Sequence, residues 1–358
     1  MTPAASLPRR IWNPPNPYLS AHRELLGEPP IAELEVYEDS SRSILSRNES
    51  PDLGFRWSVN PYRGCFHACA YCYARPTHEY LGLGAGTDFD RKILVKPDAP
   101  ALLEKAFRKR SWRGELVVFS GVTDCYQPLE AAWNLTRGCL KVCEAFGNPV
   151  GVITKSRLVR RDRDLLRRLT EVAEAEVVIS IPFLREDVVR TLEPGTPSVK
   201  RRFETMRELA DVGVPVGIAV APIVPGLNES DVPGLLREAK RCGASFAFRT
   251  LLRLPGSVPD VFFHRLREGM PLRAERVESR IRDVRGGRLT ENRFGKRHHG
   301  EGAYWDVIDR VWKLWTRRLG LRDGGDTQVT PVSSDRRGSA ATRPGGRRSS
   351  AGLQQELW

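Results

Sequence analysis

The stretch GCFHACAYCYARPTH, residues 64–78, places three cysteines within eight residues. Cys65, Cys69 and Cys72 are separated only by aromatic, small and imidazole side chains. A disulfide would use two of these thiols and leave the third unpaired. The short spacings therefore favour one polynuclear metal centre, and the rest of the chain has to indicate which centre it is.

The composition favours a large globular protein of a reducing compartment. The chain has 358 residues, enough for one barrel-sized α/β domain, and seven cysteines. The odd number of cysteines, with no apolar signal stretch after Met1, argues against a secreted disulfide framework. We therefore expect a cytoplasmic location. No run of eighteen apolar residues exists, so no membrane span is predicted.

The charge is strongly positive, with a formal net charge of +13 and a pI of about 9.7. Residues 155–168, KSRLVRRDRDLLRR, carry seven basic side chains, and a second basic stretch covers residues 265–297. Such a balance favours a polyanionic partner, nucleic acid above all, because neutralised phosphates release counterions. The alternative is a set of solvated helix faces in an arginine-rich protein, and the sequence leaves both interpretations open.

The two ends of the chain differ from its middle. Residues 1–35 are rich in proline and predict an extended segment, whereas residues 321–358 have the polar composition of a disordered tail. That tail ends in LQQELW, in which Gln354, Leu357 and Trp358 resemble the short peptide by which bacterial repair and replication proteins bind the sliding clamp. A chance match of so short a motif is the alternative.

Between the ends, in residues 36–320, apolar runs alternate with segments of helical period. The runs that predict strands are 55–59, 116–122, 150–154, 177–183, 214–224 and 244–252. The segments that predict helices are 99–110, 129–146, 162–173, 198–212 and 232–242, with Asp162 and Ser198 as N-caps and Gly213 and Gly243 after the C-termini. This alternation predicts an α/β fold, a parallel sheet curled into a partial (β/α)6 TIM-type barrel with function at the carboxyl ends of the strands.

A last helix is predicted at Tyr304–Leu319, YWDVIDRVWKLWTRRL. Its apolar side chains fall near one face: Trp305, Ile308, Val311, Trp312, Trp315 and Leu319. An apolar stripe on a helix usually faces the core, so we favour a packing role over a partner-binding one.

The three thiols suit a [4Fe-4S] cluster. Three cysteines ligate three of the four irons and leave the fourth open to a small chelating molecule. The alternative is a zinc site completed by His67 or His78. Zinc sites usually take their ligands as two separated pairs, and the second pair is missing here, so the cluster is favoured.

The pattern of Cys65, Cys69, Tyr71 and Cys72 after the first strand of a six-unit barrel resembles the radical S-adenosylmethionine (SAM) superfamily. Further stretches resemble the branch related to spore photoproduct lyase, over about residues 36–318. They are SVNPYRGC, CYARPTHEYLG, FSGVTDCYQPLE, VGVITKSRLVRRD, LEPGTPSVKRRFE and VAPIVPGLNE.

The resemblance implies a set of site residues. Cys65, Cys69 and Cys72 would hold the [4Fe-4S] cluster, whose open iron binds SAM, and reduction of SAM yields a 5′-deoxyadenosyl radical that abstracts hydrogen. The residues that the resemblance places at the cofactor are Tyr71, Thr123, Asp124, Lys155, Ser180 and Glu193. Asp124 would accept from the methionyl ammonium and Lys155 would balance the methionyl carboxylate.

The resemblance also implies individual roles for some of these residues, and it departs from the family at the hydrogen-atom donor. Tyr71 would meet the adenine, Ser180 would reach a ribose hydroxyl, and Glu193 would contact the ribose or fix the loop. In the lyase a cysteine donates a hydrogen atom from a position where this chain has Gly121. Cys125 lies just after the Thr-Asp pair, so a donor moved to Cys125 is one hypothesis, and a buried inert thiol is the other.

The remaining cysteines have two interpretations. Cys139 and Cys143 could join Cys125 in an auxiliary cluster, but small hydrophobic core positions are favoured, and Cys242 is read as structural.

The sequence as a whole predicts a radical SAM enzyme acting on nucleic acid, DNA first, with flavodoxin or ferredoxin as the electron donor. Radical modification of RNA or protein is one alternative, and a non-catalytic zinc-stabilised nucleic-acid-binding protein is another.

Overall fold

The computed structural model describes residues 13–19 and 33–324. Its centre is an eight-stranded sheet in the order β11-β10-β9-β8-β7-β6-β3-β2, parallel throughout except for the antiparallel pair β2 and β3. The strands are β2 (Leu45–Arg47), β3 (Trp57–Val59), β6 (Val117–Phe119), β7 (Val150–Thr154), β8 (Ala175–Ser180), β9 (Val216–Ile223), β10 (Phe246–Leu251) and β11 (Arg322–Asp323).

All six predicted strands are confirmed, as β3, β6, β7, β8, β9 and β10. The register is regular over the middle of the sheet, where Val150 pairs with Ala175 and Thr154 with Ile179. These central strands are buried almost throughout, because apolar side chains pack on both faces of a parallel sheet. The fold is the predicted α/β partial barrel.

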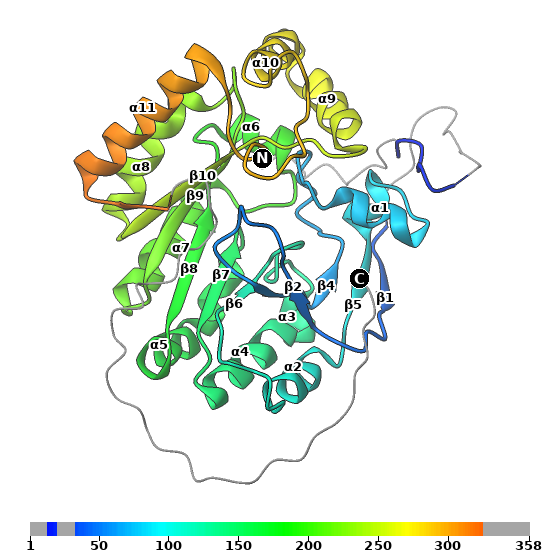
Figure 1. The fold of residues 1–358 in the computed structure, drawn as a ribbon, viewed down its shortest axis with the longest axis vertical. Helices are drawn as coiled ribbons and strands as arrows, with labels where there is room; N and C mark the ends of the chain where they lie inside the picture. The colour runs from blue at the N-terminus through cyan, green and yellow to red at the C-terminus, as the bar shows by residue number, and fades with distance from the viewer. Residues whose placement is uncertain (1–12, 20–32, 325–358) are drawn as a thin grey trace, which may run out of the picture.

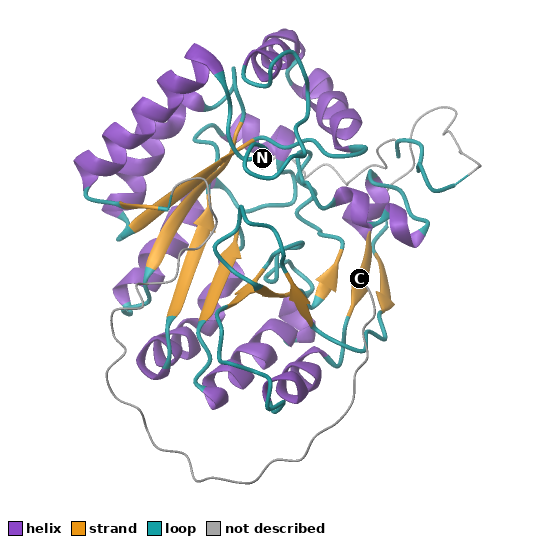
Figure 2. Ribbon diagram, viewed as in Figure 1, coloured by secondary structure: helices purple, strands orange, loops and turns teal. Residues whose placement is uncertain are grey.

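Helices cover the outer side of the sheet (Figures 1 and 2). They are α2 (Ala99–Phe107), α4 (Leu135–Phe146), α5 (Arg163–Val172), α7 (Val199–Asp211) and α8 (Val232–Arg241). The Ser198 hydroxyl accepts from the Arg201 amide as an N-cap. Gly213 and Gly243 follow α7 and α8 in the left-handed region, with φ of 85° and 91°, as predicted.

Two details of the predicted helices are wrong. The segment 129–146 is two helices, α3 (Glu130–Trp133) and α4, because Asn134 between them adopts φ of 55°. Asp162 precedes α5 but makes no side-chain cap. Its carboxylate is instead buried, where it binds Arg137 and Arg161 and accepts from the Tyr126 hydroxyl.

Several elements were not predicted. A second sheet has the order β1-β5-β4, formed by β1 (Glu35–Glu38), β5 (Lys92–Val95) and β4 (Tyr62–Arg63). The additional helices are α1 (Thr87–Arg91), α6 (Glu186–Leu192), α9 (Val258–Gly269) and α10 (Pro271–Asp283), with 3-10 turns at Arg75–Thr77, Glu79–Leu81, Arg157–Asp162 and Glu229–Asp231. Figure 1 shows α9 and α10 side by side at one end of the barrel.

The last predicted helix is α11 (Gly302–Leu319), which packs against α8. Trp305, Ile308 and Trp312 are buried in the core, and Val311, Trp315 and Leu319 pack against it, so the packing interpretation is confirmed. No described helix is long and apolar enough to cross a bilayer. The candidate clamp-binding residues Gln354, Leu357 and Trp358 lie outside the described residues, and the predicted domain boundaries stay a prediction.

Candidate active site

A cavity of about 1210 Å³ opens at the carboxyl ends of the strands. One part of its lining, which we call the cysteine wall, consists of Cys65, Cys69, Tyr71, Cys72, Thr123, Asp124, Lys155 and Ser180. A second part, the arginine wall, consists of Arg47, Ser50, Arg253, Phe294, Arg297 and His298. Parallel strands bring their ends to one edge, which is why residues so distant in sequence share this cavity.

The loop that carries the three cysteines follows β4 and packs against the segment after α6. The Ala70 amide donates to the Leu192 carbonyl at 2.8 Å, and the Gly195 amide donates to the His67 carbonyl at 3.1 Å. A Cβ on Gly195 would lie 2.2 Å from the Phe66 carbonyl oxygen. The glycine of LEPGTPS is therefore required by a close backbone approach.

Two buried arginines hold the same loop by its carbonyl oxygens. Arg75 donates to the Cys69 carbonyl from two nitrogens, at 3.0 and 2.8 Å, and Arg265 donates to the Ala68 carbonyl. Both also bind Asp90, at 2.8 and 2.7 Å. Ala68 adopts φ of 56°, and these bonds compensate for the left-handed conformation of a residue with a side chain.

The donor set fits the iron-sulfur cluster better than zinc. Neither candidate histidine joins the thiols: His67 Nδ1 lies 3.2 Å from Asp124 Oδ2, and His78 Nε2 lies 2.9 Å from the Lys92 carbonyl oxygen. Within residues 13–19 and 33–324, no three His, Cys, Asp or Glu side chains are placed to hold a single metal ion. Three thiols that line a cavity without converging on one point match a cluster, in which each binds a separate iron.

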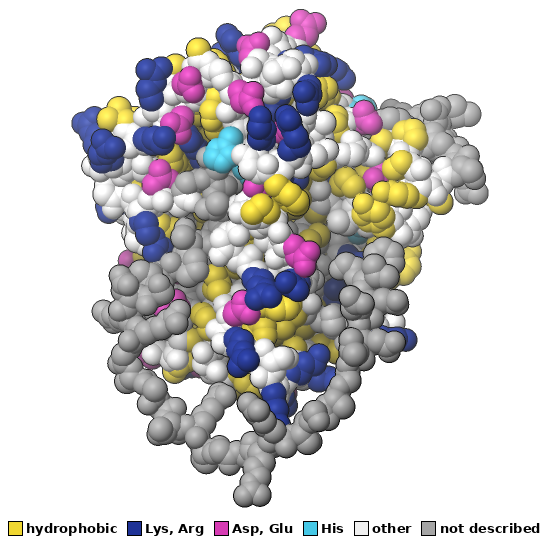
Figure 3. Space-filling view, viewed as in Figure 1, with side chains coloured by type: hydrophobic (Ala, Val, Ile, Leu, Met, Phe, Trp, Pro, Cys, Tyr) yellow, Lys and Arg dark blue, Asp and Glu magenta, His cyan; other side chains and the backbone are white. Residues whose placement is uncertain are grey.

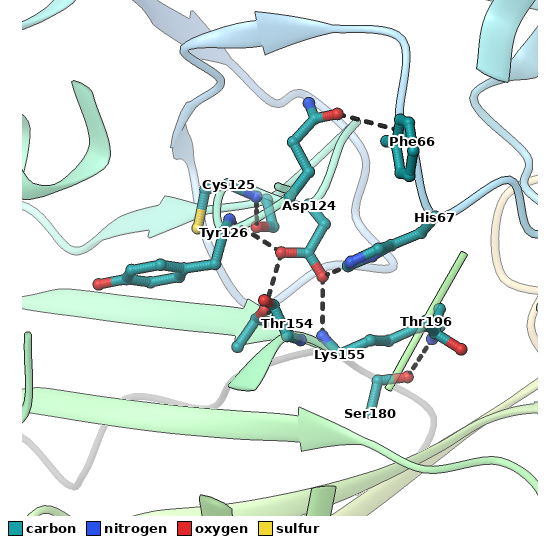
Figure 4. Close-up of polar contacts among 12 residues, drawn as sticks. Phe66, His67, Asp124, Cys125, Tyr126, Thr154, Lys155, Ser180 and Thr196 are labelled. Atoms are coloured by element: carbon teal, nitrogen blue, oxygen red, sulfur yellow. Dashed lines mark hydrogen bonds and ion pairs between the residues drawn. The ribbon is translucent and has the colours of Figure 1, made fainter. Parts of the chain in front are cut away.

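Asp124 is the centre of a dense polar network (Figure 4). Its Oδ1 accepts from the Thr154 hydroxyl at 2.7 Å and the Tyr126 amide at 2.9 Å, and its Oδ2 accepts from the Lys155 amide at 2.7 Å and lies beside His67. These four partners occupy the lone pairs of a carboxylate. Asp124 thus orients the ends of β6 and β7.

The same partners set the ionisation of Asp124. Burial raises the pKa of this carboxyl, but the His67 ring and the bonds from Lys155 and Thr154 outweigh burial. The net pKa is therefore below its ordinary value, and the group is a carboxylate at neutral pH.

Lys155 points into the cavity, and its ammonium lies 2.5 Å from Ser180 Oγ and 3.6 Å from Glu193 Oε1. Glu193 is fully buried and also binds Arg202, at 2.5 Å, and the Tyr71 hydroxyl. Burial raises the pKa of Glu193, but Arg202 and then Lys155 outweigh burial and lower it. Two cations thus share one carboxylate, which leaves a positive charge at the cavity.

The other predicted cofactor residues separate into two groups. Tyr71, Thr123 and Ser180 line the cavity, and the Thr123 hydroxyl donates to the Tyr62 carbonyl at 3.1 Å. Glu193 does not line the cavity but lies behind Lys155 and Tyr71. Its place fits the loop-fixing role better than a ribose contact.

Cys125 is fully buried and is not part of the cavity lining. It shares the hydrophobic core with Cys139 and Cys143, which are equally buried. This placement favours the inert-thiol interpretation over a hydrogen-atom donor, and core positions over an auxiliary cluster. Cys242 is buried at the end of α8.

Sequence reasoning missed the arginine wall. Arg253 follows β10, and Arg297 and His298 belong to the segment between α10 and α11. The segment is joined to the sheet where the Leu251 amide donates to the His298 carbonyl at 3.0 Å, and to the β2–β3 loop where Arg297 binds Asp52 at 2.6 Å. The available sequence signal was a basic residue directly after a barrel strand.

Comparisons with known proteins identify sequence relatives of this chain. An uncharacterized protein of Mycobacterium tuberculosis (strain ATCC 25618 / H37Rv) is 37% identical over 212 residues, 59% of this chain and 62% of that protein. An uncharacterized protein of Methanocaldococcus jannaschii is 28% identical over 240 residues, 67% of this chain and 85% of that protein. The chain thus matches less than two thirds of the length of the mycobacterial relative.

A solved structure shares the fold. A mutant of spore photoproduct lyase with dinucleoside spore photoproduct aligns over 81% of both chains, with a TM-score of 0.56 and 18% sequence identity. Residues 59–239, which include the cysteine loop and the ends of β6, β7 and β8, match the sequence profile of the radical SAM superfamily. The chain therefore belongs to the radical SAM superfamily, whose members use a [4Fe-4S] cluster and S-adenosylmethionine.

Proposed function

We propose that this radical SAM enzyme acts on a nucleic acid, with damaged DNA as the favoured substrate, in a lyase-type bond cleavage or rearrangement. The observation that carries the proposal is that one cavity is lined by the three cysteines, by a cationic lysine and by an arginine wall. Its volume of about 1210 Å³ exceeds the roughly 300–1,000 Å³ typical of a site for one small ligand. SAM and part of a substrate can therefore share it.

The cysteine wall supplies the cofactor site in this proposal. When bound, the cluster and SAM supply one-electron cleavage of the C5′–S bond, which yields methionine and a 5′-deoxyadenosyl radical that abstracts hydrogen. Cys65, Cys69 and Cys72 hold the cluster. Lys155 balances the methionyl carboxylate, because Glu193 is already shared with Arg202 and leaves one positive charge uncompensated.

The neighbouring side chains orient SAM. Ser180 accepts from Lys155 through its oxygen, which leaves its hydroxyl hydrogen free to donate to a ribose oxygen. Tyr71 presents its ring while its hydroxyl is fixed by Glu193. Asp124 acts as a positioning residue, because its four acceptor sites are used within the chain.

The proposal of a nucleic-acid substrate is supported by the arginine wall, by the net charge of +13 and by the fold shared with a spore photoproduct lyase whose structure contains dinucleoside spore photoproduct.

The proposal requires a one-electron reductant such as flavodoxin or ferredoxin as a partner. Crosslinking of the cluster-loaded protein in cell extract, followed by analysis of the captured polymer, separates the substrates. Capture of RNA or peptide in place of DNA would replace the proposed substrate.

The chemistry itself is tested by anaerobic reconstitution with iron and sulfide, reduction with dithionite in the presence of SAM, and chromatography for 5′-deoxyadenosine. We expect about four irons per chain, as a [4Fe-4S] cluster requires, and 5′-deoxyadenosine as a product. Cys69→Ala should lose both, whereas Cys242→Ala, at a buried cysteine that follows the last residue of α8, should retain both. A colourless protein that binds one zinc and forms no 5′-deoxyadenosine would contradict the assignment.

A further inference from the structure

The two basic stretches are extensively neutralised within the chain. In residues 155–168, five arginines lie within 4.0 Å of a carboxylate: Arg160, Arg161, Arg163, Arg167 and Arg168. The second stretch has the same character at Arg265, Arg267, Arg280, Arg282, Arg293 and Arg297. Figure 3 shows basic and acidic side chains interspersed over one face. Most arginines of the two stretches are therefore paired with carboxylates within the described chain.

Arg253 differs from those arginines. It lines the cavity, and among residues 13–19 and 33–324 its guanidinium has no hydrogen bond or ion pair. Its Nε is buried without a partner, and the guanidinium lies 5.7 Å from the centre of the Tyr73 ring. Burial and then Arg297 lower the pKa of Arg253. An unpaired cation in a half-buried position is destabilising, which points to an anion that binds there.

His298 is the second unpartnered group of this wall. Only 5% of the residue is exposed, and neither ring nitrogen has a partner in the described chain. Burial, Arg253 and Arg297 together lower the pKa of His298 to about 4. At neutral pH the ring is uncharged and offers one N–H donor. Buried polar atoms nearly always have partners, so this ring is also aimed at a ligand.

The rest of the wall defines how much charge the ligand carries. Arg297 is compensated by Asp52 at 2.6 Å, and Arg47 lies 3.6 Å from Glu49. Arg253 is the uncompensated cation of this wall. A singly charged group fits it, whereas a phosphomonoester brings about two negative charges. Phe294, with 60% of its area exposed, offers an apolar ring surface at the same wall.

We propose that Arg253 and His298 bind one phosphodiester group of a nucleotide substrate. The proposal rests on the proposed function, because it places a nucleic acid in the cavity. A guanidinium can donate two parallel bonds to the two unesterified oxygens, and the imidazole N–H donates a further bond. Tyr73 directly follows Cys72 and carries the Arg253 guanidinium over its ring, so the phosphodiester lies close to the cluster ligands.

The test compares d(TpT) with its uncharged methylphosphonate analogue in calorimetric titrations of the cluster-loaded, full-length protein. Wild type should bind the charged dinucleotide about tenfold or more tightly than the analogue, the order expected for a charge-assisted bond. Arg253→Gln should remove this preference. Arg293→Gln removes the same charge from the segment that carries His298, but from a guanidinium paired with Glu291, and it should keep the preference.

A second readout follows His298 directly. Titration with dimethyl phosphate, a phosphodiester with a single negative charge, should shift the ring resonances of His298 in NMR spectra of wild type and of Arg293→Gln, and leave them unmoved in Arg253→Gln. His298→Asn, which retains an N–H donor, should keep more d(TpT) affinity than His298→Phe. Equal affinity for d(TpT) and its analogue in wild type, or equal losses in the two arginine variants, would overturn the site.

These outcomes also separate the site from the proposed function. If dimethyl phosphate shifts the His298 resonances in wild type but not in Arg253→Gln, and no nucleic acid is consumed when 5′-deoxyadenosine forms, the anion site stands and the nucleic-acid function fails. If DNA is consumed with the same KM by wild type and Arg253→Gln, the function stands and the phosphodiester site is wrong.

Discussion

The cysteine wall and the arginine wall line one cavity, yet their polar groups differ in how many hydrogen-bond and ion-pair partners they have within the described chain. On the cysteine wall, Asp124 has four partners, and Glu193, which lies behind this wall, has three. On the arginine wall, the side chains of Arg253 and His298 have no hydrogen-bond or ion-pair partner among the described residues. A fully paired wall is rigid before a ligand arrives, whereas an unpaired wall gains its missing bonds from the ligand.

The two walls also differ in whether they lie within the part of the chain that matches the family. The cysteine wall lies within residues 59–239, which match the radical SAM superfamily, and Arg253 and His298 lie outside them. The shared chemistry therefore belongs to the paired wall. The unpaired wall is where we place the recognition of the substrate.

The strongest test of the paired wall is Arg202→Met. Arg202 and Glu193 are both fully buried, so the variant leaves a carboxylate with less than its full compensation. We expect a loss of about 3–5 kcal/mol in the free energy of unfolding, as for a broken buried pair. Urea denaturation measures it, with Arg201→Met, its exposed neighbour on α7, as the control. Equal stability of the two variants would contradict a tightly coupled network.

Asp124→Asn should have the next largest effect. The amide replaces one acceptor oxygen with an N–H₂ group that faces the donors now bound by Asp124, so at least one buried donor loses its acceptor. A loss of about 1–3 kcal/mol is expected. Chemical denaturation of this variant beside the exposed Asp164→Asn checks it. A variant as stable as wild type would show that the four contacts are not simultaneous.

The two walls should lose stability in different pH ranges. Folding lowers the pKa of His298 from 6.5 to about 4, so its contribution is complete above about pH 6.5 and is lost as the pH falls to about 4. Folding also lowers the pKa of Asp124 and Glu193, whose contributions persist until the pH falls below their unfolded values, near 4.

Urea titrations from pH 7 to pH 3 measure both ranges. His298→Asn should flatten the upper part of the decline and leave the lower part. Glu193→Gln should flatten only the lower part. An upper part that is unchanged in His298→Asn would contradict the buried, uncharged ring, whose charged neighbours are Arg253, Arg297, Asp52 and His299.

The smallest expected effect is on the arginine wall, where a substitution should leave the free energy of unfolding nearly unchanged or raise it. Arg253→Gln removes a half-buried cation that has no carboxylate partner, so the free energy of unfolding should stay within about 0.5 kcal/mol of wild type or rise. Thermal and urea denaturation of the ligand-free variant check this. A loss similar to that of Arg202→Met would place Arg253 in a structural network and end the contrast between the walls.

The barrel was predictable because its strands are apolar on both faces and its helices carry caps, as at Ser198 and Gly213. Local patterns did not predict the split at Asn134, where one residue adopts a left-handed conformation within a helical period. They also missed the sheet β1-β5-β4, whose strands are short and pair across more than thirty residues.

The site was predictable where it follows a motif and where strand ends meet. The cysteine spacing and the polar residues at Thr123, Lys155 and Ser180 led to one cavity. The arginine wall could not be predicted from composition, because a stretch of basic residues does not show which arginines form ion pairs with carboxylates in the folded protein. Arg253 stands out only when the partners of the other arginines are known.

The segment between α10 and α11 that carries Arg297 and His298 has a consequence for divergence among relatives. It is joined to the rest of the barrel at Leu251, Leu252, Ser50 and Asp52, and it contributes no strand to the sheet. If His298 binds the substrate as proposed, exchanges in this segment would change the recognised molecule without altering the strands of the barrel or the cysteine loop.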